Sequence, residues 1–342
     1  MSTRRPRHVV SSAGCLYGGR WSRRAAVSVF EHGESILPED LDAVIFSDTG
    51  AEWKHTWAVL PRVRQICKRH GIRFIVLRKP RKTGPLGWLR NMRAKGDRSL
   101  PAWCRGSWST IEQKAEAGAY HLRLPILNEY MRFAKIAVTV SASCTDNHKV
   151  GAIRRCMNDL SVDRFGLNNR QWAHRVRTGK LPRHRVLIGI AADEASRAIN
   201  TGRPHYERAV YPLLEMGIDK AAEAEVLERH GLGHVKKSGC FMCPYQPVGW
   251  YWALRETNPR AWQDVIDYEA TALAANPKMH IIGAAKGRPI EETVARWRER
   301  NPGATIEAVL TKEYGRGTKA CPIAASQLAL FEQVKEAVRA AA

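Results

Sequence analysis

The strongest constraint on the fold is an apolar run at residues 43–46 that ends in a polar turn and precedes a helical pattern. A short apolar run bounded by turn residues is typical of a strand buried on both faces of a sheet. Residues 52–70 have a helix-like pattern that ends at Gly71, a helix stop signal. Residues 8–12 and 73–77 are two further short candidate strands. Strands that alternate with helices in this way predict a parallel sheet with helices on its faces.

The rest of the chain extends this α/β pattern and then becomes helical. Residues 185–190 predict another strand, and the sequence from Trp250 onward has a mostly helical pattern. Pro61 is expected to kink or divide the helix in which it lies. We therefore expect an α/β nucleotide-binding domain over residues 1–245 and a mainly helical C-terminal region over residues 246–342.

The charge balance predicts a polyanionic partner. The chain has 55 Lys+Arg against 33 Asp+Glu, a formal net charge of +22. Such an excess favours DNA or RNA, because neutralised phosphates release counterions on binding. The alternative is a generally basic surface. A basic insertion at residues 78–98 contains eight Lys and Arg, a single acid and Trp88. This composition suits the binding of a nucleic-acid backbone with a stacked base. The alternative is a solvated surface loop, which has the same composition.

Hydropathy argues against a membrane location. The longest weakly polar run, around residues 136–143, is far shorter than the ~20 residues of a membrane span. The early residues Arg4, Arg5 and Arg7 are not followed by an apolar segment of signal-peptide type. We expect a cytoplasmic protein whose eight cysteines are thiols or metal ligands rather than disulfides.

The loop after the first candidate strand is a candidate phosphate site. A glycine-containing loop that opens a helix presents backbone N–H groups and the positive end of the helix dipole to phosphate oxygens. Two alignments of such a loop fit this segment, one through residues 11–14 and one through residues 18–22. Together they give the candidate ligands Ser11, Ser12, Gly14, Gly18, Gly19 and Ser22.

The turn Asp48-Thr49-Gly50 follows the buried strand directly and is a second candidate ligand site. Open α/β sheets bind nucleotides in the crevice outside the carboxyl ends of their strands. A side chain such as Asp48 can hydrogen-bond a ribose, a substrate or a metal-bound water. The alternative is that Asp48 caps the helix that follows.

Cys240 and Cys243 form a Cys-x-x-Cys pair, whose spacing allows both thiolates to face one metal ion. Thiolates suit zinc or an iron–sulfur cluster. A pair is half a site, so further ligands must come from elsewhere, and Cys104, Cys156 and Cys321 compete for the last position. The alternative is a redox-active or merely buried dithiol.

The segment 189–197 carries three charged residues that could serve a ligand. Asp193 and Glu194 could orient a nucleotide or pair with Arg197. As the alternative, the two acids begin a helix and stabilise its N-terminus.

These segments, in this order, resemble those of the phosphoadenosine-phosphosulfate-reductase-like family on the PP-loop ATPase scaffold. Residues 18–22 are similar to the Gly-Gly-x-x-Ser part of a PP-loop, and residues 48–50 to the family's Asp-Thr-Gly turn. Residues 144–149 resemble its Cys-Thr-x-x-x-Lys segment, and residues 189–197 its Gly-Ile-x-x-Asp-Glu-x-x-Arg stretch. The Cys-x-x-Cys-Pro at 240–244 is most similar to that of DNA phosphorothioation sulfur-transfer proteins and phage relatives.

The resemblance covers roughly residues 11–262 and implies an open, mostly parallel PP-loop ATPase-like sheet with helices on both faces. It implies ATP bound across the first loop and Asp48, with Lys149 as a second catalytic candidate. It also implies a [4Fe–4S] cluster, or zinc as the alternative. The implied metal ligands are Cys144, Cys240 and Cys243.

The resemblance and the charge together predict ATP-dependent sulfur transfer to, or modification of, a nucleic acid through an adenylated intermediate. A separate protein would donate the sulfur. One alternative is a sulfonucleotide reductase, which needs no large basic surface, and another is a base-modifying enzyme of 7-deazaguanine type. A third is a non-catalytic nucleic-acid-binding protein with structural zinc, because Tyr17 and Trp21 replace the usual Ser and acidic residue of the PP-loop.

Overall fold

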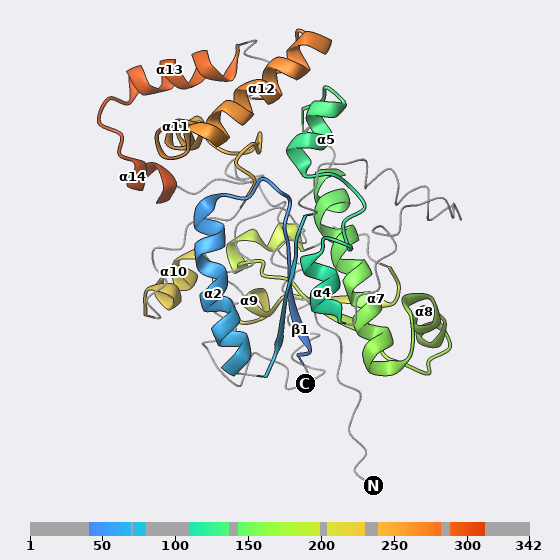
Figure 1. Ribbon diagram of the computed structural model, residues 1–342. Coiled ribbons are helices and arrows are strands. Elements are labelled where there is room, and N and C mark those ends of the chain that lie inside the picture. The colour runs from blue at the N-terminus through green and yellow to red at the C-terminus, as the bar shows by residue number, and fades with distance from the viewer. Residues whose placement is uncertain are drawn as a thin grey trace.

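The computed structural model describes residues 41–69, 71–79, 110–136, 143–198, 204–229, 239–281 and 288–311. These residues form a mixed α/β structure, with helices around a central pair of strands and a group of helices at one end (Figure 1). The candidate strand at 8–12 and the phosphate loop that follows it lie outside the described residues.

The described elements run as strands and helices first and as helices alone afterwards. The strands are β1 (Ala43–Ser47), β2 (Arg73–Leu77), β3 (His184–Leu187) and β4 (Glu207–Val210). The first helices are α2 (Lys54–Arg69), α4 (Ile111–Glu116), α5 (Ile126–Arg132), α6 (Ser143–Thr145), the π-helix η2 (Asp146–Val150), α7 (Gly151–Phe165) and α8 (Asn169–Arg177). The later ones are the 3-10 helix η3 (Ala192–Arg197), α9 (Pro212–Glu215), α10 (Lys220–Arg229), α11 (Val248–Thr257), α12 (Pro259–Ala275), α13 (Ile290–Arg300) and α14 (Ile306–Thr311).

Strands β1 and β2 pair in parallel, which confirms the strands predicted at 43–46 and 73–77. Ser47 at the end of β1 lies opposite Leu77 at the end of β2. Side chains alternate between the two faces of a strand: Ala43 and Ile45 belong to the core cluster that contains α7, whereas Val44 belongs to the cluster that contains α2. Helices therefore cover both faces of this strand pair, as Figure 1 shows.

Strands β3 and β4 form a second parallel pair, with His184 opposite Glu207. The strand predicted at 185–190 thus begins one residue earlier and ends at Leu187. The sequence did not predict β4, whose four residues include two charged ones. Glu207 is nonetheless buried, because Arg154 of α7 donates to its carboxylate at 3.1 Å.

Helix α2 is one element from Lys54 to Arg69 with Pro61 inside it, so the expected division at this proline is wrong. Proline removes one hydrogen bond from a helix interior. The helix nevertheless continues, with Leu60 and Val63, on either side of Pro61, packed against the strands. The stop predicted at Gly71 is confirmed, since this residue adopts a φ of 65°.

The helices from α11 to α14 pack around a cluster rich in aromatic side chains, including Trp250, Tyr251 and Tyr268. Trp53 and Ile126 belong to the same cluster. The C-terminal helices therefore share a core with the segment that follows β1 and with the start of α5. No helix of the described segments is both long enough and apolar enough to cross a membrane.

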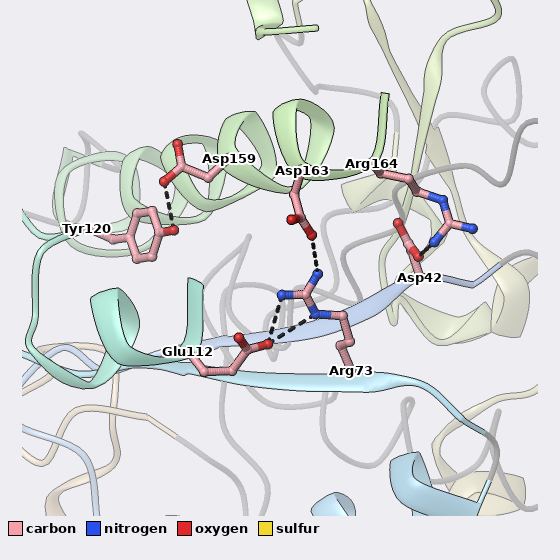
Figure 2. Close-up of polar contacts among 7 residues, drawn as sticks. All are labelled: Asp42, Arg73, Glu112, Tyr120, Asp159, Asp163 and Arg164. Carbon is pink, nitrogen blue, oxygen red and sulfur yellow. Dashed lines mark hydrogen bonds and ion pairs between the residues drawn. The ribbon is translucent and has the colours of Figure 1, made fainter. Parts of the chain in front are cut away.

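An ionic network ties the starts of the two strands to the surrounding helices (Figure 2). Arg73, the first residue of β2, donates to Glu112 of α4 at 2.8 and 3.0 Å and to Asp163 of α7 at 3.0 Å. Arg164 pairs with Asp42 beside the start of β1. These pairs hold α4 and α7 against the strands at the end opposite to Asp48.

We expect Arg73→Leu to lower the free energy of unfolding by about 1 kcal/mol, because it removes two partly exposed ion pairs. The loss should shrink at high salt, which screens exposed charges. Urea denaturation at two salt concentrations measures both effects. Lys278→Leu, at an exposed lysine, is the control for the change in net charge. An equal loss in both variants would contradict a role for the network.

Candidate functional site

Asp48 closes the end of β1 and ties it to the end of β2. One carboxylate oxygen accepts the backbone N–H of Gly50 at 2.7 Å, and the other accepts that of Lys79 at 3.2 Å. Burial raises the pKa of the Asp48 carboxyl, and these two N–H donors oppose the shift. The residue that the sequence singles out thus lies at the carboxyl edge of a parallel strand pair, where α/β sheets bind nucleotides.

Both the backbone conformation at position 50 and its close packing against Pro125 require glycine. Its φ of 81° lies in the left-handed region that favours glycine. A Cβ atom on Gly50 would stand 2.6 Å from the Cβ of Pro125. The adjacent Thr49 carbonyl accepts the backbone N–H of Ile126 at 2.9 Å. The Asp48-Thr49-Gly50 turn is therefore packed directly against the start of α5.

The same turn contacts the Cys-x-x-Cys segment. The Thr49 hydroxyl donates to Glu52 at 3.0 Å and lies 3.1 Å from the Sγ of Cys240. The backbone adds an isolated antiparallel bridge between Glu52 and Cys240, and the Phe241 N–H donates to the Ala51 carbonyl at 2.8 Å. Two motifs nearly 200 residues apart in the sequence thus form one site.

A π-helix presents His148 and Lys149 to this site. The Ser47 hydroxyl at the end of β1 donates to the His148 carbonyl at 3.0 Å, which fixes η2 against the strand. Burial, and then the Glu52 charge, raise the pKa of Cys240 above its usual value, and the charge of the buried Lys149 opposes this shift. Single turns of π-helix occur frequently at functional sites. The structure thus places the charge of Lys149 near Cys240.

Lys79 is the main site residue that sequence reasoning missed, because it belongs to the predicted basic insertion at 78–98. It is not available to a nucleic-acid backbone at the surface: only 6% of it is exposed, and its Nζ donates to the Leu124 carbonyl at 3.1 Å. Arg78 is also engaged, over the ring of Trp57 at 4.4 Å and beside Glu116. Residues 80–98 lie outside the described part of the chain.

Lys79 continues into a buried polar chain with His148 and Glu129. The Lys79 Nζ lies 3.0 Å from the Nδ1 of His148, and the Nε2 of that ring lies 3.8 Å from a Glu129 oxygen. Burial, and then the Lys79 charge, lowers the pKa of His148 to about 2, so the ring is neutral and accepts from Lys79. Burial lowers the pKa of Lys79 to about 7. At neutral pH this cluster can therefore take up or release a proton.

The three expected metal ligands are cysteines that no disulfide joins. Cys144 and Cys240 pack against the core cluster of the C-terminal helices, and Cys243 follows Cys240 in a turn. Among the residues that the structure describes, no three His, Cys, Asp or Glu side chains converge as a metal-ligand set. Cys104 and Cys321, two competitors for a further position, lie outside the described residues, and Cys156 is buried in the core of α7.

Little of the remaining predicted ligands lies within the described residues. Asp193 is exposed near the start of the 3-10 helix η3, and the side chain of Arg197 is not among those described. The six predicted phosphate ligands lie outside the described residues: Ser11, Ser12, Gly14, Gly18, Gly19 and Ser22.

We expect Gly50→Ala to lower the free energy of unfolding by about 2–4 kcal/mol, because it adds backbone strain and a clash with Pro125. Gly71→Ala is the matched control, since Gly71 has a φ of 65° and nothing within 4 Å of an added Cβ. The control should lose only about 1 kcal/mol, the strain alone. Urea denaturation measures both, and equal losses would rule out the Pro125 contact as the cause.

The lowered pKa of Lys79 predicts a specific dependence of stability on pH. Between pH 7 and its ordinary pKa of 10.5, the unfolded chain binds more protons at this residue than the folded chain does. The contribution of Lys79 to stability therefore rises with pH in this window. From pH 7 to 8.5, we expect the unfolding free energy of the wild type to rise by about 1–2 kcal/mol relative to that of Lys79→Met. Lys180→Met, at an exposed lysine, should follow the wild type; parallel profiles for Lys79→Met would contradict the prediction.

The sequence matches no protein-family model and has no significant similarity to any curated protein. The resemblance to the phosphoadenosine-phosphosulfate-reductase-like family therefore rests on the motifs quoted above. What the protein does must be inferred from the side chains that meet at the ends of β1 and β2.

Proposed function

We propose that this protein is an ATP-dependent enzyme that modifies a nucleic acid, by sulfur transfer through an adenylated intermediate. The observation that carries the proposal is the contact between the Thr49 hydroxyl and the Cys240 thiol at 3.1 Å. It places a sulfur atom beside the Asp48-Thr49-Gly50 turn at the carboxyl edge of a parallel strand pair. A nucleotide bound at that edge would lie next to this thiol.

The proposed reaction has two steps. In the first, a substrate oxygen attacks the α-phosphorus of ATP, and pyrophosphate leaves as the adenylated nucleic acid forms. In the second, a sulfur nucleophile attacks the adenylated carbon or phosphorus centre, and AMP leaves with the oxygen. Both steps build negative charge on phosphate oxygens, which nearby cations stabilise.

The residues of the site suit these steps. Lys79 is buried beside Asp48, and the buried Lys149 acts electrostatically on Cys240. The Nε2 of His148 is buried without a hydrogen-bond partner among the described residues, so a neutral ring has an N–H to offer a substrate oxygen. Asp48 orders the turn by accepting two backbone N–H groups. The phosphate loop at residues 11–22 would complete the nucleotide site.

The partners and the cofactor belong to the same proposal. The net charge of +22 supports a nucleic-acid substrate, and a sulfur-donor protein would supply the sulfur. A reducing cytoplasm would keep the thiols free. Cys144, Cys240 and Cys243 would hold a [4Fe–4S] cluster, with a zinc ion as the alternative. No step of the proposed reaction depends on that group.

We expect Cys240→Ser to abolish sulfur incorporation into nucleic acid and to leave ATP affinity within about twofold, because the thiol borders the nucleotide site without forming it. Mass spectrometry of the digested nucleic acid measures incorporation, and titration calorimetry measures ATP binding. Cys67→Ala is the control, since Cys67 is on the buried face of α2. Unchanged incorporation by Cys240→Ser would exclude this thiol as a participant.

The metal content separates the cofactor alternatives. Anaerobic purification followed by analysis for iron, acid-labile sulfide and zinc identifies the group that the cysteines hold. Comparable iron and sulfide would support a cluster in a sulfur-transfer enzyme. About one zinc per chain, with no release of pyrophosphate from ATP, would instead support the non-catalytic nucleic-acid-binding alternative.

A further inference from the structure

The end of helix α5 carries an exposed aromatic ring between two cations. Phe133 is 55% exposed, more than the other large exposed apolar side chains of the described residues, Val162 and Met216. The guanidinium of Arg132 lies 6.0 Å from the centre of its ring, and the ammonium of Lys135 lies 5.8 Å from it. Because this ring is exposed to solvent, it does not stabilise the hydrophobic core.

The backbone holds these three side chains in a fixed arrangement. The Lys135 N–H donates to the Tyr130 carbonyl at 3.0 Å, and the Ala134 N–H donates to the Met131 carbonyl at 3.0 Å. These two bonds are the Schellman motif that ends a helix with one left-handed residue, usually glycine. Ala134 takes that position with a φ of 46°, the only positive φ outside glycine in the described chain. Phe133 therefore lies on an ordered helix end.

The charge around the ring is positive. Glu129, the acid of α5, is buried and accepts from Arg123 at 2.7 Å. Neither Arg132 nor Lys135 has an acidic partner within the part of the chain that the structure describes. An aromatic face flanked by free cations matches the chemistry of single-stranded nucleic-acid binding, in which bases stack on rings and phosphates pair with Lys or Arg.

Helix α5 links this surface to the candidate site. At its start, Ile126 donates to the Thr49 carbonyl at 2.9 Å. On its inner side, Tyr130 stacks on Tyr268 of α12, with ring centres 6.3 Å apart, and α5 lies between α12 and the strand region in Figure 1. Seven residues of helix span about 10 Å at 1.5 Å per residue. That length corresponds to about three nucleotides at 3.4 Å each along a stacked strand.

We propose that Arg132, Phe133 and Lys135 form a docking platform for single-stranded nucleic acid, with a base stacked on the Phe133 ring and phosphates paired with the two cations. The strand would then run along α5 toward the Asp48-Thr49-Gly50 turn. This direction rests on the proposed function, whereas binding at the platform does not. A lone ring between two cations suits a stacked base better than a protein surface, which would bury a wider apolar patch.

The test compares two substitutions at Phe133. Phe133→Leu keeps an apolar side chain but removes the flat face, and Phe133→Trp keeps the face. Fluorescence anisotropy with labelled 12-nucleotide single strands of mixed sequence, as DNA and as RNA, measures the affinity of each full-length variant. We expect Phe133→Leu to weaken binding about tenfold and Phe133→Trp to retain it. Met216→Leu, at another exposed side chain, should bind as the wild type does.

The two cations are tested separately, through the dependence of the affinity on salt concentration. Arg132→Gln and Lys135→Gln should each reduce the slope of log affinity against log salt by about 0.7, the value for one phosphate contact on a single strand. An unchanged slope in both variants would overturn their assignment. Equal affinity of Phe133→Leu and the wild type for both single strands would overturn the stacking, as would Phe133-dependent binding to phosphatidylserine vesicles without any binding of oligonucleotide.

Failure of the platform and failure of the proposed function give different results. Phe133-dependent strand binding without pyrophosphate release from ATP would keep the platform and reject the enzyme. Release of pyrophosphate that Phe133→Leu leaves unchanged, together with wild-type strand affinity, would keep the enzyme and reject the platform. A preference of the wild type for the DNA or the RNA strand would identify which nucleic acid it uses.

Discussion

The candidate site depends on the two backbone N–H groups that the Asp48 carboxylate accepts, one from its own turn and one from Lys79, two residues after β2. This bridge exists only in the observed parallel register, in which Ser47 lies opposite Leu77. A slip by one residue would turn every β1 side chain to the other face of the sheet. The register therefore decides whether Lys79 reaches Asp48 and whether the turn can meet Cys240.

The electrostatics of the site follow from burial. Desolvation moves Asp48, Lys79 and His148 toward their neutral forms, so the buried cluster carries less charge than its sequence suggests. A phosphate group placed among these side chains would reverse this for Lys79, because a nearby negative charge favours the ammonium. Under the proposed function, ATP would then bind together with a proton. A buried polar cluster that carries little charge by itself is suited to bind a charged ligand.

Sequence reasoning predicted the parts that follow from local patterns. The strands at 43–46 and 73–77, the stop at Gly71 and the mixed α/β class depend on apolar periodicity and turn residues, and the structure has them. Strand β4 was missed because its charged residues become strand-like only when Arg154 neutralises the buried Glu207. Lys79 was assigned to a surface loop because composition does not show which lysine of a basic run is buried. The contact of Thr49 with Cys240 joins residues 191 positions apart, a separation that no local signal spans.

For the binding of a nucleic acid, the positions of the cations matter more than the net charge. A net charge of +22 favours nucleic acid, yet several of these charges serve the fold: Arg73 and Arg154 hold elements together through carboxylates, and Lys79 is buried beside Asp48. Such charges cannot release counterions from a nucleic acid, because they are already neutralised or enclosed. Arg132 and Lys135 differ, since both are exposed and both flank an aromatic face. The specific argument for a nucleic-acid partner therefore comes from this helix end, where free charge and a stacking surface occur together.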